Sequence, residues 1–137
     1  MIQEYLMNEL KTVIPHLTWF VDYYYAKDNT GTVYVSSGKQ PDLYDMKYRY
    51  PSYQIWIRSS DWDYAKYAAE VTINALHKKS NLIVEVDYEK DGEVVETKRY
   101  LVLLILATTE SLRIGDNDGV MEYSVNFDVT LKELKEE

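Results

Sequence analysis

The residues that could do chemistry are few in this chain, and their spacing matches no catalytic or ligand-binding motif. The two histidines, His16 and His77, form no His-x-x-x-His or Glu-x-x-His pair, the spacings that place two metal ligands on one helix face. The 5 glycines form no Gly-x-Gly-x-x-Gly or Walker pattern. Without cysteine there is no thiolate zinc site and no Cys nucleophile. We therefore expect no cofactor, no metal ligands, no catalytic residues and no enzymatic activity.

Carboxylates form the two remaining candidate clusters. Asp116 and Asp118 stand between glycines in segment 115–119, which is similar to part of a calcium loop but lacks the distal bidentate Glu. We interpret it as a polar loop before the last strand. Asp61 and Asp63 could form an acid/base cluster with nearby Arg58, yet carboxylates at the start of a helix are expected for capping alone. An enzyme with a carboxylate site there stays an alternative.

The elements that would position these residues begin with two helices, predicted from apolar residues at 3- and 4-residue steps. The first covers residues 2–13 and ends at Pro15. The second covers residues 60–77, where the Ser60 hydroxyl is expected to accept a backbone N–H and two following aspartates suit the positive end of the helix dipole. Small residues on this helix allow close packing on a sheet: Ala65, Ala68 and Ala69.

Strands are predicted from β-branched and aromatic residues and from alternating polarity. They span residues 17–25, 32–36, 53–58, 82–90, 93–106 and 120–131. The first two, separated by turn-like residues 27–31, are expected to form a hairpin. Asp91-Gly92 is the strongest hairpin signal, because both residues tolerate positive φ. Residues 100–106 are interpreted as a buried central strand, and residues 36–43 as a loop.

These elements predict an α+β fold, with a mixed, mainly antiparallel sheet packed against two helices and a projecting β-hairpin at Asp91-Gly92. A chain of 137 residues with 46% hydrophobic residues has the usual size of one folded unit, so we predict a single domain over residues 1–137. The charged residues 132–137 are expected to form a frayed tail.

Charge and apolar content limit the class of partner. The formal net charge of -8 repels phosphate, which argues against binding to DNA or to an anionic membrane surface. The longest apolar run, residues 100–107, is far shorter than the roughly 20 residues of a membrane-spanning helix. The N-terminal segment has early acidic residues and no long apolar stretch, so no signal peptide is expected. The lack of cysteine fits synthesis in a reducing cytoplasm.

Tyrosine is the unusual component, with 14 residues in all, most of them crowded into the first half of the chain. Tyrosines are enriched at protein interfaces because each buries a large rigid area and keeps a hydroxyl for hydrogen bonding. The same residues could simply cover the rim of a small core. They leave open a monomeric binding module whose tyrosine-rich surface, including segment 23–50, takes a peptide or a glycan.

Residues 50–77 resemble a segment of the minor capsid and tail terminator proteins of tailed bacteriophages. Those proteins carry a strand of the type Gln-Ile-x-Ile-Arg, a polar turn, and an Ala-rich helix that ends in Leu-His or Leu-Asn. The matching positions here are Gln54, Ile55, Ile57, Arg58, Asp61, Ala65, Ala68, Ala69 and Leu76. Residues 123–129 are similar to the family's closing strand, and the order of elements agrees over residues 2–131. Ser59 stands where the family usually has glycine, and residues 23–50 have no match.

The resemblance implies a structural virion protein that forms a ring, usually a hexamer, at the head-proximal end of the tail tube. Such a ring stops tube polymerisation and joins the tail to the head connector. The implied partners are other copies of the chain, the tail tube protein and a head-completion or connector protein, with DNA only as passing cargo. A ring needs a heterologous interface, which a hairpin inserted into a neighbour can supply. The candidate contact residues are Tyr88, Lys90, Asp91, Gly92, Glu93, Val95 and Arg58.

Overall fold

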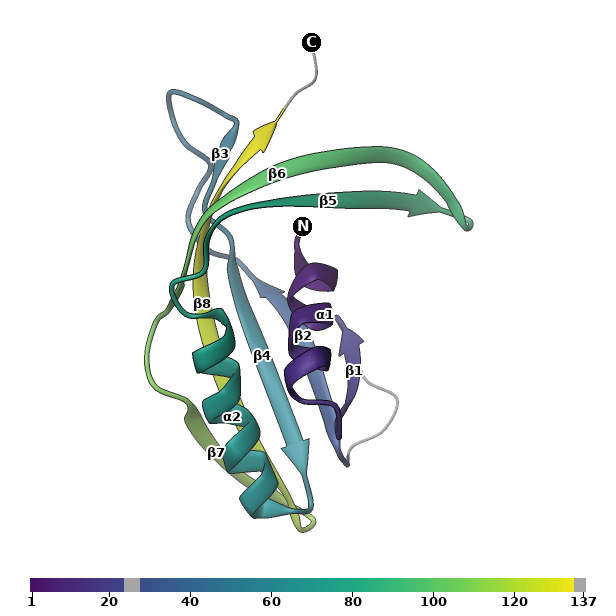
Figure 1. The fold of residues 1–137 in the computed structure, drawn as a ribbon, viewed down its shortest axis with the longest axis vertical. Helices are drawn as coiled ribbons and strands as arrows, with labels where there is room; N and C mark the ends of the chain where they lie inside the picture. The colour runs from purple at the N-terminus through teal and green to yellow at the C-terminus, as the bar shows by residue number, and fades with distance from the viewer. Residues whose placement is uncertain (24–27, 135–137) are drawn as a thin grey trace.

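The computed structural model describes residues 1–23 and 28–134. Two helices lie on one side of an 8-stranded, mostly antiparallel sheet, which confirms the predicted α+β class (Figure 1). The elements in chain order are α1 (Gln3–Val13), β1 (Thr18–Val21), β2 (Thr30–Ser36), β3 (Tyr48–Arg49), β4 (Ser52–Ser59), α2 (Trp62–Leu76), β5 (Ser80–Lys90), β6 (Glu93–Ala107), β7 (Leu112–Asn117) and β8 (Val120–Leu134).

The long strand β8 organises the sheet, whose order is β1-β2-β4-β8-β6-β5. The short strands β3 and β7 also pair with β8. The helix-facing side of β8 carries Val125, Phe127, Val129 and Leu131, which are buried with Leu6 and Leu10 of α1 and Ala65 and Ala69 of α2. Because the apolar residues of β8 alternate with polar ones, only one side of the central strand is packed against helices.

The predicted hairpin over residues 17–25 and 32–36 is wrong, because β1 and β2 pair in parallel, from Thr18 opposite Thr30 to Val21 opposite Val33. Thr30 and Gly31, predicted as turn residues, lie inside β2. Trp19 covers Gly31 so closely that a Cβ there would lie 2.4 Å from the Trp19 Cζ3 atom. Strand composition and alternation are the same for both pairing directions, so the sequence pattern could not separate them. Residues 24 and 25 of the predicted strand, and residue 27 of the predicted turn, lie outside the described residues.

The strand–helix unit β4–α2 is confirmed, with one correction at the start of the helix. Asp61, not Ser60, is the N-cap residue, and its carboxylate accepts the Tyr64 N–H at 3.1 Å. The Ser60 hydroxyl instead donates to Asp28 Oδ2 at 2.7 Å, and the Ser60 N–H donates to Asp28 Oδ1 at 2.7 Å. The Ser60 side chain, which the local sequence predicted as the cap of α2, thus bonds instead to a residue from a distant segment of the chain.

The hairpin at Asp91-Gly92 is confirmed as a turn: Lys90 pairs with Glu93, and φ is +55° at Asp91 and +81° at Gly92. β6 pairs with β8 only from Arg99 onward, so residues 93–98 pair with β5 alone among the described strands. In Figure 1 the two arms run beyond the end of α1. That this hairpin projects to reach a neighbouring molecule stays a prediction.

Two other expectations are corrected at the C-terminal end of the chain. β7 was not predicted, and it includes residues 115–117 of the segment interpreted as a loop; only Asp118 and Gly119 form the turn into β8. β8 continues to Leu134, so residues 132–134 belong to the sheet rather than to a frayed tail. Residues 135–137 lie outside the described part. Both errors come from polar residues that are tolerated because one side of these strands faces solvent.

The interpretation of residues 100–106 as a fully buried strand is also wrong in part. β6 is central, between β8 and β5, and Tyr100, Val102 and Ile105 are buried. Leu106, on the side away from the helices, is 39% exposed. A continuous apolar run is buried on both faces of the sheet only where other elements cover both faces.

Candidate assembly surfaces

The distal part of the β5–β6 hairpin is held together by contacts between its own side chains. The Tyr88 and Tyr100 hydroxyls lie 3.2 Å apart, and the Thr97 hydroxyl donates to Asp87 Oδ1 at 2.7 Å. Burial, with the hydrogen bond to Tyr88 as a second cause, raises the pKa of Tyr100 well above its usual value, so the Tyr100 hydroxyl is neutral at physiological pH. These contacts stabilise the hairpin, and its outer strand β5 ends the sheet with a free edge among the described strands.

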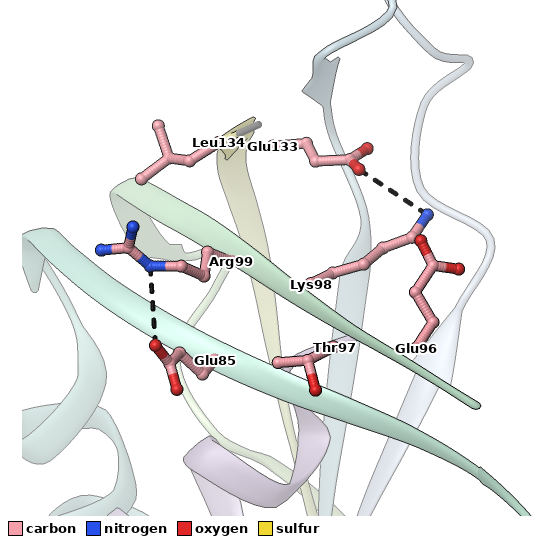
Figure 2. Close-up of a pocket in the computed structure, with 7 residues that line it drawn as sticks. All are labelled: Glu85, Glu96, Thr97, Lys98, Arg99, Glu133 and Leu134. Atoms are coloured by element: carbon pink, nitrogen blue, oxygen red, sulfur yellow. Dashed lines mark ion pairs between the residues drawn. The ribbon is translucent and has the colours of Figure 1, made fainter. Parts of the chain in front are cut away.

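A shallow cavity of about 420 Å³ lies where this hairpin joins the end of β8 (Figure 2). Arg99 Nε lies 3.6 Å from Glu85 Oε1, and Lys98 Nζ lies 3.8 Å from Glu133 Oε1. Figure 2 shows the two ion pairs on separate sides of the cavity. The charges of both signs are matched across strands, so the lining is suited to fixing the register of a contact rather than to reacting with a substrate.

Arg58 is separated from the hairpin by the length of β8. It pairs with Glu122 at the start of β8, whereas Arg99 of the hairpin pairs with Leu134 at the other end. Twelve residues of strand span about 40 Å, so Arg58 and the hairpin lie near opposite ends of β8. Arg58 is only 7% exposed, and its Nε donates to Glu122 Oε1 at 2.8 Å.

The chemically reactive candidates have structural roles. His77 Nδ1 accepts the Ala107 N–H at 2.9 Å, and the His16 ring packs edge-on against Tyr64 at 5.6 Å. Asp61 caps α2, while Asp116 and Asp118 are exposed. Within residues 1–23 and 28–134 no three His, Cys, Asp or Glu side chains gather as a metal-binding group. No helix in the same residues is both long and apolar enough to cross a membrane.

A family model described as bacteriophage tail terminator protein matches residues 5–133 of the 137 residues. The chain belongs to the bacteriophage tail terminator family. Among curated proteins, none matches the chain at a significant level. Membership makes this terminator a structural component of the phage virion and a protein that interacts with other phage proteins.

The positions that carried the resemblance hold the terminator's β4–α2 unit together. Ile55, Ile57, Ala65, Ala69 and Leu76 are all buried in the core. On the other side of β4, Gln54 Nε2 donates to Ser124 Oγ of β8 at 3.0 Å. These positions therefore identify the fold, and of them only Asp61 is exposed.

The described tyrosines of the terminator differ widely in exposure, and Tyr24 and Tyr25 lie outside the described residues. Tyr53 is fully buried, where its hydroxyl accepts the Ile2 N–H at 3.2 Å, and burial raises the pKa of Tyr53 to about 12. Tyr44, in contrast, is 98% exposed on the loop before β3. The loop predicted over residues 36–43 carries exposed apolar side chains at its end and just beyond it, which its composition alone did not single out. The sequence feature that could have indicated this exposed surface is a cluster of apolar residues within the loop: Leu43, Tyr44 and Met46.

Proposed function

We propose that this terminator acts as a single domain that assembles into a homo-oligomeric ring, a hexamer, at the head-proximal end of the tail tube. The ring stops tube polymerisation and presents a surface to the head connector. The protein acts by binding, without catalysis or cofactor, and is made in the cytoplasm of the bacterial host before it joins the virion. Membership of the tail terminator family is the observation that carries this proposal.

The hairpin supports ring formation because its distal part has few strand partners among the described residues. There the backbone of residues 93–98 pairs with β5 alone, and Val94 and Val95 are 52% and 63% exposed. A two-stranded ribbon is marginally stable alone in water, and a neighbour's sheet or helix would add the missing packing. The proposed contact consists of Tyr88, Lys90, Asp91, Gly92, Glu93 and Val95. Arg58, the remaining candidate, lies near the other end of β8 in an ion pair with Glu122 and would meet a neighbour through a separate contact.

The charge of the chain suits a ring around a DNA channel. Six copies at -8 each carry a formal charge of -48. Repulsion between like charges would let DNA pass through the lumen without adhering to it. Mixed charges on the hairpin would at the same time select one register and discourage random pairing of sheet edges.

The mass of the full chain in solution, measured by light scattering, tests ring formation. We expect a mass that is a multiple of 16.1 kDa, with six copies favoured. A monomer at every concentration, with no capping of tail tubes, would contradict the ring and would favour the monomeric binding module.

The hairpin contact is tested by replacing residues 88–96 with Asn-Gly, which joins the cross-strand pair Asp87 and Thr97 by a two-residue turn. We expect a folded monomer by circular dichroism that no longer forms rings or terminates tails. Asp118→Asn is the matched control, because it makes an Asn-Gly turn between β7 and β8, outside the proposed contact, and keeps the full hairpin. Normal assembly of the shortened chain would remove the hairpin from the interface.

A further inference from the structure

Among the large apolar side chains of the described residues, the three with the greatest exposed fraction lie on the loop between β2 and β3. Leu43 is 75% exposed, Tyr44 98% and Met46 79%. We call residues 42–47 the apolar turn. Tyr44 alone presents on the order of 200 Å², about a quarter of the roughly 800 Å² that one partner contributes to a standard interface. Such a concentration of apolar surface on an otherwise polar loop is typical of a protein contact.

The apolar turn is fixed by hydrogen bonds in spite of its exposure. Asp42 Oδ2 accepts the N–H groups of Asp45 at 2.9 Å and Tyr44 at 3.1 Å, and Asp42 Oδ1 accepts the Tyr50 hydroxyl at 2.9 Å. These hydrogen bonds hold the pKa of Asp42 below its usual value, and the bond from the Asp45 N–H has the largest effect. The carboxylate is therefore ionised at neutral pH. The Glu133 N–H donates to the Lys47 carbonyl at 2.8 Å and ties the turn to β8. Because the turn is already ordered before binding, it loses little conformational entropy when it binds a partner.

A second uncovered apolar surface lies on the side of the sheet away from the helices. We call it the outer patch. The register places Leu104 and Leu106 of β6 opposite Thr130 and Asp128, polar residues of β8 that alternate with the buried ones. Ile83 of β5 lies opposite Leu101 of β6. Ile83 is 57% exposed, Leu112 47% and Leu106 39%. In Figure 1 both helices lie on the other side. The outer patch consists of Ile83, Leu101, Leu104, Leu106 and Leu112.

We infer that the apolar turn of one copy packs on the outer patch of a second copy. A closed ring uses two different surfaces of the same chain, one meeting the other on each neighbour. The described part of this chain offers such a pair: a protruding fixed turn and an uncovered sheet face of matching apolar chemistry. Together with the hairpin, this contact brings the buried area toward that of a stable interface. The inference rests on the proposed ring and names the surfaces that close it.

The absence of cysteine allows a direct cross-linking test in the full chain. Met46→Cys on the apolar turn is mixed with an affinity-tagged Leu112→Cys chain and treated with a short bismaleimide. Both positions are exposed, so neither substitution threatens the core. We expect the mixed-size product of one turn variant and one patch variant to dominate. The control replaces the patch partner by Tyr67→Cys, which is 59% exposed on α2, on the helix side of the sheet.

Several results would overturn the inference. A mixed product no more abundant than with Tyr67→Cys excludes the contact, and products only between two patch variants indicate face-to-face packing instead. If light scattering shows a ring but no turn–patch product forms, the ring stands and this contact is wrong. If the chain is monomeric, the ring proposal and this inference both fail.

A second variant tests the energetic role of the apolar turn. Tyr44→Asp places a charge where the side chain is fully exposed, so folding should be unchanged. We expect the concentration needed for half-maximal assembly to rise at least about tenfold, because truncation of a buried aromatic contact residue commonly has that effect. The matched control is Tyr67→Asp, with no expected change. Equal assembly of both variants would contradict the contact.

Discussion

The contact of α2 with the sheet should fail when a charge is forced into it, and Ala69→Glu is the sharpest such change. Ala69 is 1% exposed, and its neighbours one helical turn away, Ala65 and Thr72, are fully buried. A carboxylate on this stripe would enter the core with no cation among the buried residues of the helix.

The magnitude follows from the cost of burying an ionised group. Full burial raises a carboxyl pKa by up to about 3–5 units, so the buried group takes up a proton by pH 7 instead of staying charged. The penalty at pH 7 is then set by the roughly 2.7 units between this pH and the unfolded pKa of about 4.3, which at 1.36 kcal/mol per unit gives about 3.5 kcal/mol. Overpacking adds about 1–3 kcal/mol. A domain of this size is stable by about 5–15 kcal/mol, so the variant should lose a third or more of its stability. We expect the melting temperature at pH 7 to fall by at least about 15 °C.

Two controls separate charge from size and position. Ala69→Gln adds similar volume without charge, while Tyr67→Glu places the same carboxylate at a position that is 59% exposed. Because burial raises the folded-state pKa above the unfolded value of about 4.3, the penalty is absent below that pH and grows as pH rises toward neutrality. The melting temperatures of the Ala69→Glu and Ala69→Gln variants, followed by circular dichroism, should therefore converge near a pH of about 4. An unchanged melt for Ala69→Glu at pH 7 would refute the packing.

Three further outcomes are expected. Gly31→Ala should destabilise the fold by about 1–3 kcal/mol in urea unfolding, because the new Cβ would lie 2.4 Å from a ring atom of Trp19, and an unchanged midpoint would place the ring elsewhere. Burial raises the pKa of Tyr53 to about 12, so the folded chain should lose stability as pH rises from about 10 to 12, and Tyr53→Phe should lessen that alkaline loss. Chelator should leave the melting temperature and the assembly state unchanged, whereas a clear drop would indicate a cation held by segment 115–119.

Local chemistry was enough to predict several elements. The 3- and 4-residue apolar steps predicted α1, and the small residues Ala65 and Ala69 predicted the packed side of α2. Asp91-Gly92 predicted its turn because few other dipeptides accept positive φ at both positions. The strand–helix pattern over residues 50–77 also predicted the family that the comparison shows. Each of these signals is contained within a few neighbouring residues.

Long-range partners decided the rest. The parallel pairing of β1 with β2, and the bond that diverts Ser60 to Asp28, depend on segments that meet only in the folded chain. The same holds for exposure: Leu106 stands in an apolar run that predicts burial, yet no helix in the described residues covers its side of the sheet. Apolar composition fixes which side chains gain from leaving water, and only the tertiary arrangement determines which of them remain uncovered for a second molecule.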